Sequence, residues 1–340
     1  MNDVVSRLQR RALALAALRR TLDGRGFLEV DTPLLVQGPG LEPHIDPLCV
    51  HVRRDATATP ERRFLITSPE VAMKKLLAQG AGRIYQLGPV FRDGETTKRH
   101  AIEFTMLEWY RAPGSIEEVL QDTLALLQAV AAVMVETKAQ PAFDVAQEPE
   151  RLRVTHCFER FAGIDLRRCL LAMREGDVDA LPRAARLAGL TLRPGADFED
   201  AFFQVMGECV EPRIGQHRLA VVEQWPTQMA ALARTCDEDD LFANRFEIYG
   251  RGLELCNAFD ELTDPVEQRR RFVSDNEARA RLGKELLPID DDFLALLPRM
   301  PRSAGNALGV DRALMLLSGT AAIEDVRATA SWSVPPVRDR

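Results

Sequence analysis

Apolar residues near the start of the chain recur at steps of three and four, the spacing of one face of an α-helix. The positions in this pattern are Val5, Leu8, Ala12, Leu15, Leu18 and Leu22. Asp3 supplies a side-chain oxygen that can cap the first turn, and Gly24 and Gly26 provide a stop. The pattern therefore predicts an amphipathic helix that ends before Gly24.

Alternation of apolar and polar residues predicts strands at residues 27–31, 84–92 and 103–110. Pro33 restricts the first of these to a sheet edge or a strand end. The polar, charged segment 93–100 joins the other two, so we expect an antiparallel hairpin with a long loop.

A second hairpin is predicted around Gly250-Arg251-Gly252, which separates apolar runs at 246–249 and 253–256. A short strand at 219–222 should end before Trp225-Pro226. Residues 305–309 are expected to form a strand or turn that leads into a final helix at 311–317.

The remaining pattern is mainly helical. Ser68 can cap a helix that has Pro69 in its first turn and Glu70 at its positive end. Further helices are expected at 116–138 and 265–282, a mostly helical insertion at about 155–210, and loops with short strands at 38–62. Strands joined by hairpins between helices indicate an α+β fold, with a mainly antiparallel sheet flanked by helices.

Composition fits an ordinary globular protein, because 46% of the 340 residues are hydrophobic and 28% are charged. The 51 acidic and 44 basic residues give a net charge of −7, which disfavours non-specific binding of nucleic acid. No apolar run approaches the ~18 residues of a membrane helix, and no signal-peptide cleavage site follows the first helix. The six cysteines form no C-x-x-C pair, so reduced thiols in the cytoplasm are expected.

Several common catalytic motifs are absent from the sequence. The chain has no P-loop, no G-x-G-x-x-G, no G-x-S-x-G and no H-E-x-x-H. This absence disfavours P-loop kinases, Rossmann dehydrogenases, serine hydrolases of the nucleophile-elbow type and zincins.

Polar groups nevertheless repeat inside apolar strands. Glu108 and Tyr110 share one strand face, and Asn257, Phe259 and Glu261 again follow a spacing of two. Taken singly, each is explained by a solvated side chain or a surface ion pair worth ~0–1 kcal/mol. Together, the repeated polar positions are less easily explained as surface side chains, since a charge buried among apolar residues needs a partner.

Three segments resemble the signatures of the class II aminoacyl-tRNA synthetases. GFLEVDTP at 26–33 resembles the first signature, which lies at the dimer interface of the family. The segment 91–111, which includes EFTMLE at 103–108, resembles the second, and GVDR at 309–312 the third. The resemblance covers nearly all of residues 5–330 and implies the class II catalytic core.

A finer resemblance is to lysyl-tRNA synthetases, through TSPE at 67–70 and NAFDEL at 257–262. Those enzymes carry an anticodon-binding barrel before the first signature, and the residues before Gly26 are too few to fold one. The chain therefore resembles the truncated elongation factor P–lysine ligases, and we expect a single catalytic domain over 1–340 without anticodon recognition. Ala307 agrees, because the ligases have alanine where the synthetases usually have glycine.

The resemblance implies an AMP-forming ligase that uses ATP and Mg²⁺ to activate lysine, preferably (R)-β-lysine, for transfer to a lysine of elongation factor P. A homodimer is also implied. The implied catalytic residues are Arg92 and Arg312. Those implied to bind ATP are Arg92, Asp93, Gly94, Glu95, His100, Glu254, Leu255, Gly309 and Arg312. Those implied to bind the amino acid are Ser68, Pro69, Glu70, Glu108, Tyr110, Asn257, Phe259, Glu261 and Ala307. The implied metal ligands are Glu247 and Glu254.

Two positions depart from the family pattern. Gly94 stands where the second signature usually has an acid, and Ala101 stands where an ATP-contacting asparagine is usual. Either Glu95 and His100 compensate or ATP binds weakly. Two alternatives therefore remain: a lysine-activating enzyme with another acceptor, such as tRNA or a small molecule, and a non-catalytic synthetase-like regulator.

Overall fold

A computed structural model describes residues 4–230 and 232–328. The chain forms two compact units. Unit 1 comprises Met1–Ala142 with Thr263–Arg340, and unit 2 comprises Phe143–Leu262. The predicted cap Asp3 lies outside the described residues.

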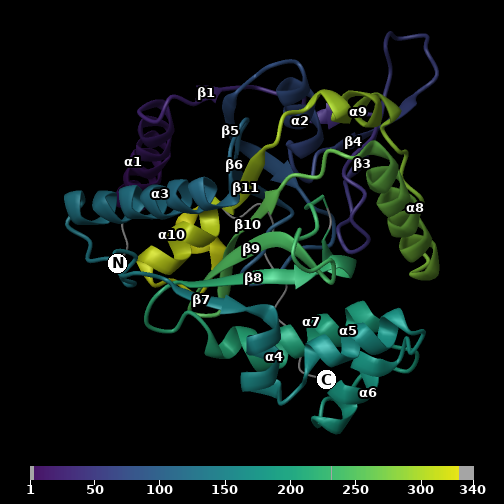
Figure 1. Cartoon of the computed structure of the whole chain (residues 1–340). Coiled ribbons are helices and arrows are strands. Elements are labelled where there is room, and N and C mark those ends of the chain that lie inside the picture. Colours follow the sequence, from purple (N-terminus) through teal and green to yellow (C-terminus); the bar gives the residue numbers. More distant parts are fainter. Residues whose placement is uncertain (1–3, 231, 329–340) are drawn as a thin grey trace, which may run out of the picture. The chain divides into compact units, whose positions relative to one another are not determined.

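Four strands of unit 1 lie in the order β1-β5-β6-β11 (Figure 1). Their bounds are Leu28–Glu29, Arg83–Phe91, Glu103–Arg111 and Ala304–Gly309. β1 runs parallel to β5, and the β5–β6 and β6–β11 pairs are antiparallel. A smaller antiparallel sheet has the order β2-β4-β3, with bounds Leu35–Val36, Glu61–Leu65 and Cys49–Val52. The predicted hairpin and the edge position of the first strand are confirmed.

The helices of unit 1 include α1 (Val4–Asp23), α3 (Ile116–Glu136) and α10 (Val310–Ser318), which lie side by side in Figure 1. The others are α2 (Glu70–Ala78), α8 (Pro265–Arg281) and α9 (Asp291–Leu296). The buried Asp122 of α3 accepts a bidentate pair of hydrogen bonds from Arg111 of β6, at 2.6 and 2.8 Å, and one from Arg25. This network fixes α3 against the sheet.

Unit 2 has the strand order β10-β9-β8-β7. The bounds are Leu253–Asp260, Phe242–Gly250, Ala220–Pro226 and Glu150–Arg153. Its helices are α4 (Val154–Ala162), α5 (Leu166–Arg174), α6 (Ala180–Leu187) and α7 (Phe198–Val205), and α7 continues into a π-helical turn, Met206–Val210. These helices pack on β8 through a core that includes Phe158, Phe202 and Trp225, and they confirm the predicted helical segment.

The β9–β10 turn confirms the second predicted hairpin. Its two central residues, Arg251 and Gly252, both have positive φ, at 50° and 67°. A side chain on Gly252 would place its Cβ 2.4 Å from the carbonyl oxygen of Glu211. Gly252 is therefore required both by the turn and by the approach of the neighbouring backbone.

Three local predictions need correction. The N-terminal half of the predicted apolar face of α1 is solvent-exposed, and the buried positions are Ala14, Ala17, Leu18 and Leu22. β8 continues through Trp225-Pro226, because a β-bulge at Gln224 lets the strand resume its pairing. Pro69, not Ser68, is the N-cap residue of α2, although the Ser68 hydroxyl accepts a hydrogen bond from the backbone N–H of Glu70 at 3.1 Å.

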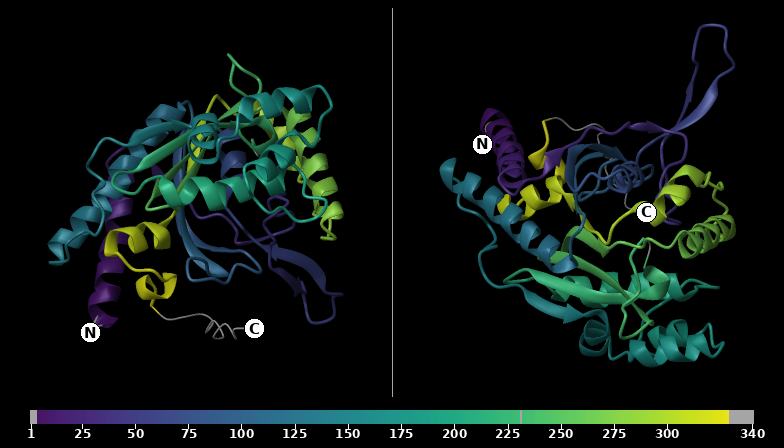
Figure 2. Two further views of the ribbon diagram at one scale, coloured as in Figure 1. Left: turned by 90° about the horizontal axis from the view of Figure 1, so that it is seen from below. Right: turned by 45° about the horizontal axis from the view of Figure 1, so that its top comes forward.

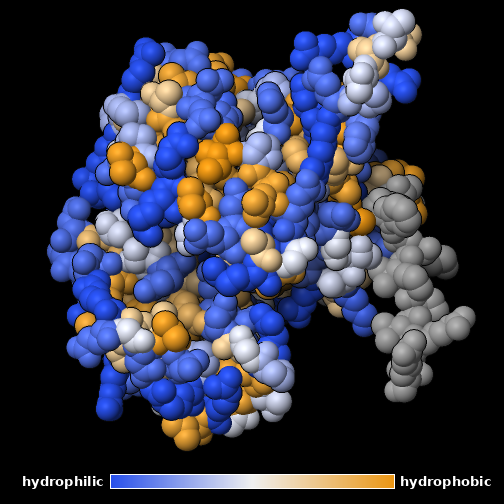
Figure 3. All heavy atoms as spheres, turned by 90° about the vertical axis from the view of Figure 1, so that its right-hand side faces the viewer, coloured by the Kyte–Doolittle hydropathy of each residue, from blue (hydrophilic) through white to orange (hydrophobic). Residues whose placement is uncertain are grey.

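The β3–β4 hairpin projects from unit 1, as both views in Figure 2 show. Its projecting segment, residues 53–60, is largely hydrophilic. The same hairpin projects from the hydropathy-coloured surface in Figure 3. Arg54 and Arg63 both form ion pairs with Glu61. Two arginines of the hairpin thus share one carboxylate, while Arg62 pairs with Glu285, outside the hairpin.

Among the described residues, α3 is the one helix long and apolar enough to cross a membrane. Half of its most apolar window is buried within the protein. Its buried face carries Asp122, which is paired with arginines, so α3 is accounted for as a core helix.

Candidate active site

A buried carboxylate marks the first cluster of predicted site residues in unit 1. Glu108, on β6, is only 1% exposed. One of its oxygens accepts a hydrogen bond from the hydroxyl of Ser68 at 2.6 Å, and the other accepts one from the hydroxyl of Tyr110 at 2.6 Å. The shared face of Glu108 and Tyr110 follows from their spacing of two on a strand.

Glu70 lies close enough to Glu108 for their charges to interact. Its carboxylate is paired at 2.5 Å with the ammonium of Lys74, one turn further along α2. Lys74 is 1% exposed and the Glu70 side chain is 12% exposed. The cluster therefore holds two carboxylates and one internal ammonium.

The environment of Glu108 favours its protonated form. Burial, followed by the negative charge of Glu70, raises the pKa of the Glu108 carboxyl well above its usual value, although Ser68, Tyr110 and Lys74 act in the opposite direction. Ala307 faces Glu108 across the β6–β11 pairing, so the methyl group predicted to line the substrate pocket lies on a strand position beside this carboxylate.

Arg92 follows the last residue of β5, and its backbone N–H donates to the carbonyl of Ile102 at 2.8 Å. Its guanidinium carbon lies 5.1 Å from the ring centroid of Phe104. Its Nη1 is 3.8 Å from Oε1 of Glu95. Gly94, with φ of +75°, forms the turn between them. Glu95 thus provides a carboxylate near Arg92, although Gly94 cannot.

Arg312 lies in the first turn of α10, directly after Gly309 ends β11 and caps the helix. Its Nη2 is 2.6 Å from Nε2 of His100. Because a guanidinium only donates, Nε2 must accept, which places the proton of a neutral His100 on Nδ1, 2.7 Å from the hydroxyl of Thr97. The neighbouring Asp311 accepts from the backbone N–H of Thr105 at 2.8 Å, which holds the start of α10 to β6.

The other predicted residues belong to unit 2. Glu247 on β9 is buried and accepts hydrogen bonds from Arg245, at 2.5 Å, and from the hydroxyl of Tyr249. Burial raises the pKa of Glu247 above its usual value; Arg245 opposes this rise and the charge of Glu254 adds to it. Glu254, on β10, stands opposite Tyr249 of β9. Two neighbouring carboxylates of this kind suit a hard divalent cation.

Asn257 stands opposite Glu247 in the β9–β10 pairing, and Phe259 stands opposite Arg245. Asn257 Oδ1 accepts from Nε of Arg245 at 3.0 Å, and the Arg245 guanidinium lies 5.7 Å from the Phe259 ring centroid. Glu261 follows β10 and is 2% exposed. Leu255 is buried in β10.

The structure thus groups the predicted residues by unit. In unit 1 it brings together Ser68, Glu70, Glu108 and Tyr110, and separately His100 with Arg312. In unit 2 it brings together Glu247, Asn257 and Phe259. The convergence of Glu108 with Glu261 and the role of each individual residue stay predictions.

Sequence reasoning missed Lys74 and Arg245. Lys74 lies four positions after Glu70, and Arg245 two positions before Glu247. Each spacing places the pair on one face, of a helix for the first and of a strand for the second. This signal was available in the sequence, but many surface ion pairs share it.

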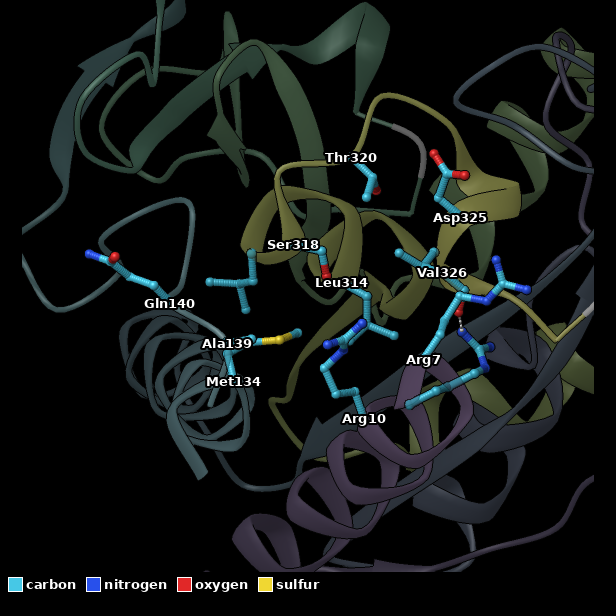
Figure 4. Close-up of a pocket in the computed structure, with 12 residues that line it drawn as sticks. Arg7, Arg10, Met134, Ala139, Gln140, Leu314, Ser318, Thr320, Asp325 and Val326 are labelled. Carbon is cyan, nitrogen blue, oxygen red and sulfur yellow. Dashed lines mark hydrogen bonds between the residues drawn. The ribbon is translucent and has the colours of Figure 1, made fainter. Parts of the chain in front are cut away.

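A cavity of about 170 Å³ lies elsewhere in unit 1 (Figure 4). Side chains from α1, the end of α10 and the segment after it point toward the cavity, and Arg11 donates to the carbonyl of Val326 at 3.2 Å. The residues that line it are Arg7, Arg10, Arg11, Met134, Ala139, Gln140, Leu314, Leu317, Ser318, Thr320, Asp325 and Val326. None of these is a predicted site residue.

Comparison with known proteins gives a consistent result. A family model described as tRNA synthetases class II (D, K and N) matches residues 1–332. An Elongation factor P--(R)-beta-lysine ligase of Edwardsiella ictaluri is 38% identical over 326 residues, which cover 95% of this chain and 94% of that protein. The proteins of the same name from Erwinia tasmaniensis and Haemophilus influenzae are 38% and 36% identical, with the same coverage of both chains. The chain therefore belongs to the family of class II tRNA synthetases, alongside the elongation factor P–(R)-β-lysine ligases.

Proposed function

We propose that the chain is an ATP-dependent, AMP-forming ligase that activates lysine and transfers it to a lysine side chain of elongation factor P. The similarity to ligases of that name over 95% of the chain supports this function. The observation that carries the lysine specificity is the buried carboxylate of Glu108, held by two hydroxyl groups beside Glu70. A buried acid of this kind is suited to an ammonium group.

In the first step, a carboxylate oxygen of the amino acid attacks the α-phosphorus of ATP, and pyrophosphate leaves with the electrons of the broken P–O bond. Two anions approach each other in this step, so cationic side chains are needed where charge develops. We assign this role to Arg92 and Arg312. The Phe104 ring and Glu95 flank the Arg92 guanidinium, and His100 contacts that of Arg312.

Glu247 and Glu254 are the residues that would hold Mg²⁺. Their adjacent charges and oxygen donors fit a cation that takes one or two carboxylates and completes its shell with water and phosphate oxygens. When bound, the ion would neutralise charge on the triphosphate. Arg245 and Tyr249 keep the Glu247 carboxylate in place through their hydrogen bonds.

In the second step, the ε-amine of the acceptor lysine attacks the carbonyl carbon of the adenylate. The C–O bond to phosphate breaks, AMP leaves, and the amine gives up a proton as the amide forms. No covalent intermediate with the enzyme is needed, so the cysteines have no part in this scheme.

The finer assignments are also proposals. We assign Glu70 to the substrate amine nearest the carboxylate, and Glu108, Tyr110 and Glu261 to the distal ammonium. Ala307 favours (R)-β-lysine over α-lysine. We further propose one catalytic domain, a homodimer that uses the segment 26–33, and action in the cytoplasm without anticodon recognition.

The test is mass spectrometry of purified elongation factor P after incubation with the enzyme, ATP and either lysine isomer. The expected result is the mass increase of one lysyl group, which is the same for both isomers, in a larger fraction of elongation factor P with (R)-β-lysine. Formation of the adenylate without modification of elongation factor P would point to another acceptor. Tight amino-acid binding without pyrophosphate exchange would identify a regulator and contradict the proposal.

A further inference from the structure

The amino-acid cluster of unit 1 contains a cation of its own. Lys74 is 1% exposed, and its ammonium lies 2.5 Å from Oε1 of Glu70. A lysine withdrawn from water to this extent is costly unless its partner is well placed, and replacing such a pair by apolar residues is often neutral or stabilising. Stability alone is therefore a weak reason for a lysine at this position.

The position of Lys74 ties it to the ligand-binding groups. It lies one helical turn after Glu70 on α2, and its charge also acts on Glu108. The backbone N–H of Glu70 donates to the Ser68 hydroxyl at 3.1 Å, and that hydroxyl donates to Glu108 at 2.6 Å. One continuous set of contacts thus runs from the Lys74 ammonium to the Glu108 carboxylate.

We propose that Lys74 is a positioning residue for amino-acid binding, which occupies one oxygen of Glu70 and turns the other oxygen of that carboxylate toward the substrate amine. The inference rests on the proposed function of this cluster. It adds a residue that does not itself touch the substrate but fixes one that does. Without the ammonium, two acids would face each other in a site shielded from water.

The neighbouring residue provides a matched control. Lys75, on the same helix, pairs with Asp290 at 2.6 Å, and its side chain is 26% exposed. Lys74→Met and Lys75→Met each remove one ammonium from α2, the first with the ion pair to Glu70 and the second with the ion pair to Asp290. They differ in the carboxylate that is left behind and in the burial of the lysine.

The experiment measures lysine-dependent exchange of pyrophosphate into ATP, with KM determined separately for (R)-β-lysine and for ATP. We expect Lys74→Met to raise the amino-acid KM at least tenfold and to change the ATP KM less than twofold. Lys75→Met should change neither by more than twofold. An amino-acid KM unaffected by Lys74→Met, or equal rises in both KM values, would overturn the inference.

A double-mutant cycle separates positioning from a general structural effect. If Lys74 acts through Glu70, Lys74→Met should have little further effect on the amino-acid KM in a Glu70→Gln background, whereas additive effects would contradict the inference. The double variant removes both charges of the Lys74–Glu70 pair and keeps the test available if Lys74→Met alone fails to fold. Absence of lysine-dependent exchange in the unmodified protein would instead refute the proposed function.

Discussion

The charge of Glu108 depends on what enters its site. It is buried, its oxygens accept from two hydroxyl groups, and another acid lies nearby. Burial, followed by the charge of Glu70, raises the pKa of Glu108 in the unliganded protein, although the two hydroxyl hydrogen bonds act to lower it. An arriving ammonium reverses this balance, because it favours the ionised carboxylate.

Amino-acid binding should accordingly release protons. Between the ordinary Glu pKa and the raised pKa of Glu108, the folded protein holds a proton that the unfolded chain has lost, so the stability of the unliganded protein falls as pH rises through this window. Ligand affinity should rise with pH over the same window. Calorimetric titrations with (R)-β-lysine in buffers of different ionisation enthalpy should detect up to about one proton released.

Glu108→Gln serves as the control for this linkage, because the amide keeps the shape and does not titrate. The variant should bind the amino acid more weakly and show no buffer dependence. Binding heats of the unmodified protein that are the same in all buffers would contradict the prediction.

Ala307 is a second residue whose effect can be isolated. Its methyl group is carried on β11 at the position that faces Glu108. Ala307→Gly should shift the ratio of kcat/KM for α-lysine over (R)-β-lysine upward by about tenfold, the low end of what one methyl group contributes in a pocket. The ratio cancels a general loss of activity, and an unchanged ratio would remove Ala307 from substrate discrimination.

At the level of elements, the β9–β10 hairpin fixes the spacing of the unit 2 residues. Its two-residue turn, together with a register shift between Glu254 and Cys256, sets the register of the strands beyond it. In that register Asn257 stands opposite Glu247 and Phe259 opposite Arg245. Both turn residues have positive φ, which matches the right-handed twist of the flanking strands. A change in the turn therefore disturbs the site from outside it.

Gly252→Ala tests this dependence against a matched glycine. Gly163, after α4, has the same φ of +67° but open space where a Cβ would lie, whereas a Cβ at Gly252 would meet the Glu211 carbonyl. Gly163→Ala should lower the free energy of unfolding by about 1–2 kcal/mol, the cost of the left-handed conformation. Gly252→Ala should lower it by a further ~1–3 kcal/mol from overpacking. Urea titrations followed by circular dichroism give the comparison, and equal losses would show that the Glu211 contact is unimportant.

The hairpins could be predicted because their signals are local. Residues 84–110 and 246–256 carry both the alternation and the turn chemistry within a short stretch. The bulge at Gln224 could not be predicted in this way, since pairing with β9 extends β8 beyond the apolar run. Likewise, periodicity showed that α1 is amphipathic but not that the tertiary fold leaves Val5 and Leu8 uncovered.

The same distinction between local signals and tertiary packing applies to the candidate site. The spacing of two placed Glu108 beside Tyr110, and the structure confirms that contact. Glu70 pairs with Lys74 and Glu247 pairs with Arg245, because these cations are buried beside them. Which cation is buried beside each carboxylate depends on packing rather than on sequence spacing. The functional roles of these residues were predicted from resemblance to a family.

For the whole molecule, the distribution of apolar surface bears on assembly. On α1, Val5 is 55% exposed and Leu8 is 38% exposed, and Leu28 at the sheet edge is 64% exposed. The resemblance places the segment 26–33 at a dimer interface, and α1 packs against β1, which belongs to that segment. The exposed apolar positions are accounted for if a second copy of the chain covers them.

A charged substitution on this surface should therefore dissociate the proposed dimer. The combined variant Val5→Glu and Leu8→Glu places four carboxylates in a twofold interface, where they would lose water without gaining partners. The dissociation constant from sedimentation equilibrium should rise by roughly 100-fold or more, which corresponds to about 2.7 kcal/mol. Leu187→Glu is the control, because Leu187 on α6 is 84% exposed and belongs to unit 2, not to α1 or the segment 26–33. Its dissociation constant should stay within twofold of that of the unmodified protein. A monomeric unmodified protein would exclude the dimer. A combined variant that remains dimeric would place the contact elsewhere. The two substitutions leave the buried face of α1 intact, so a loss of the dimer would not reflect unfolding of the helix.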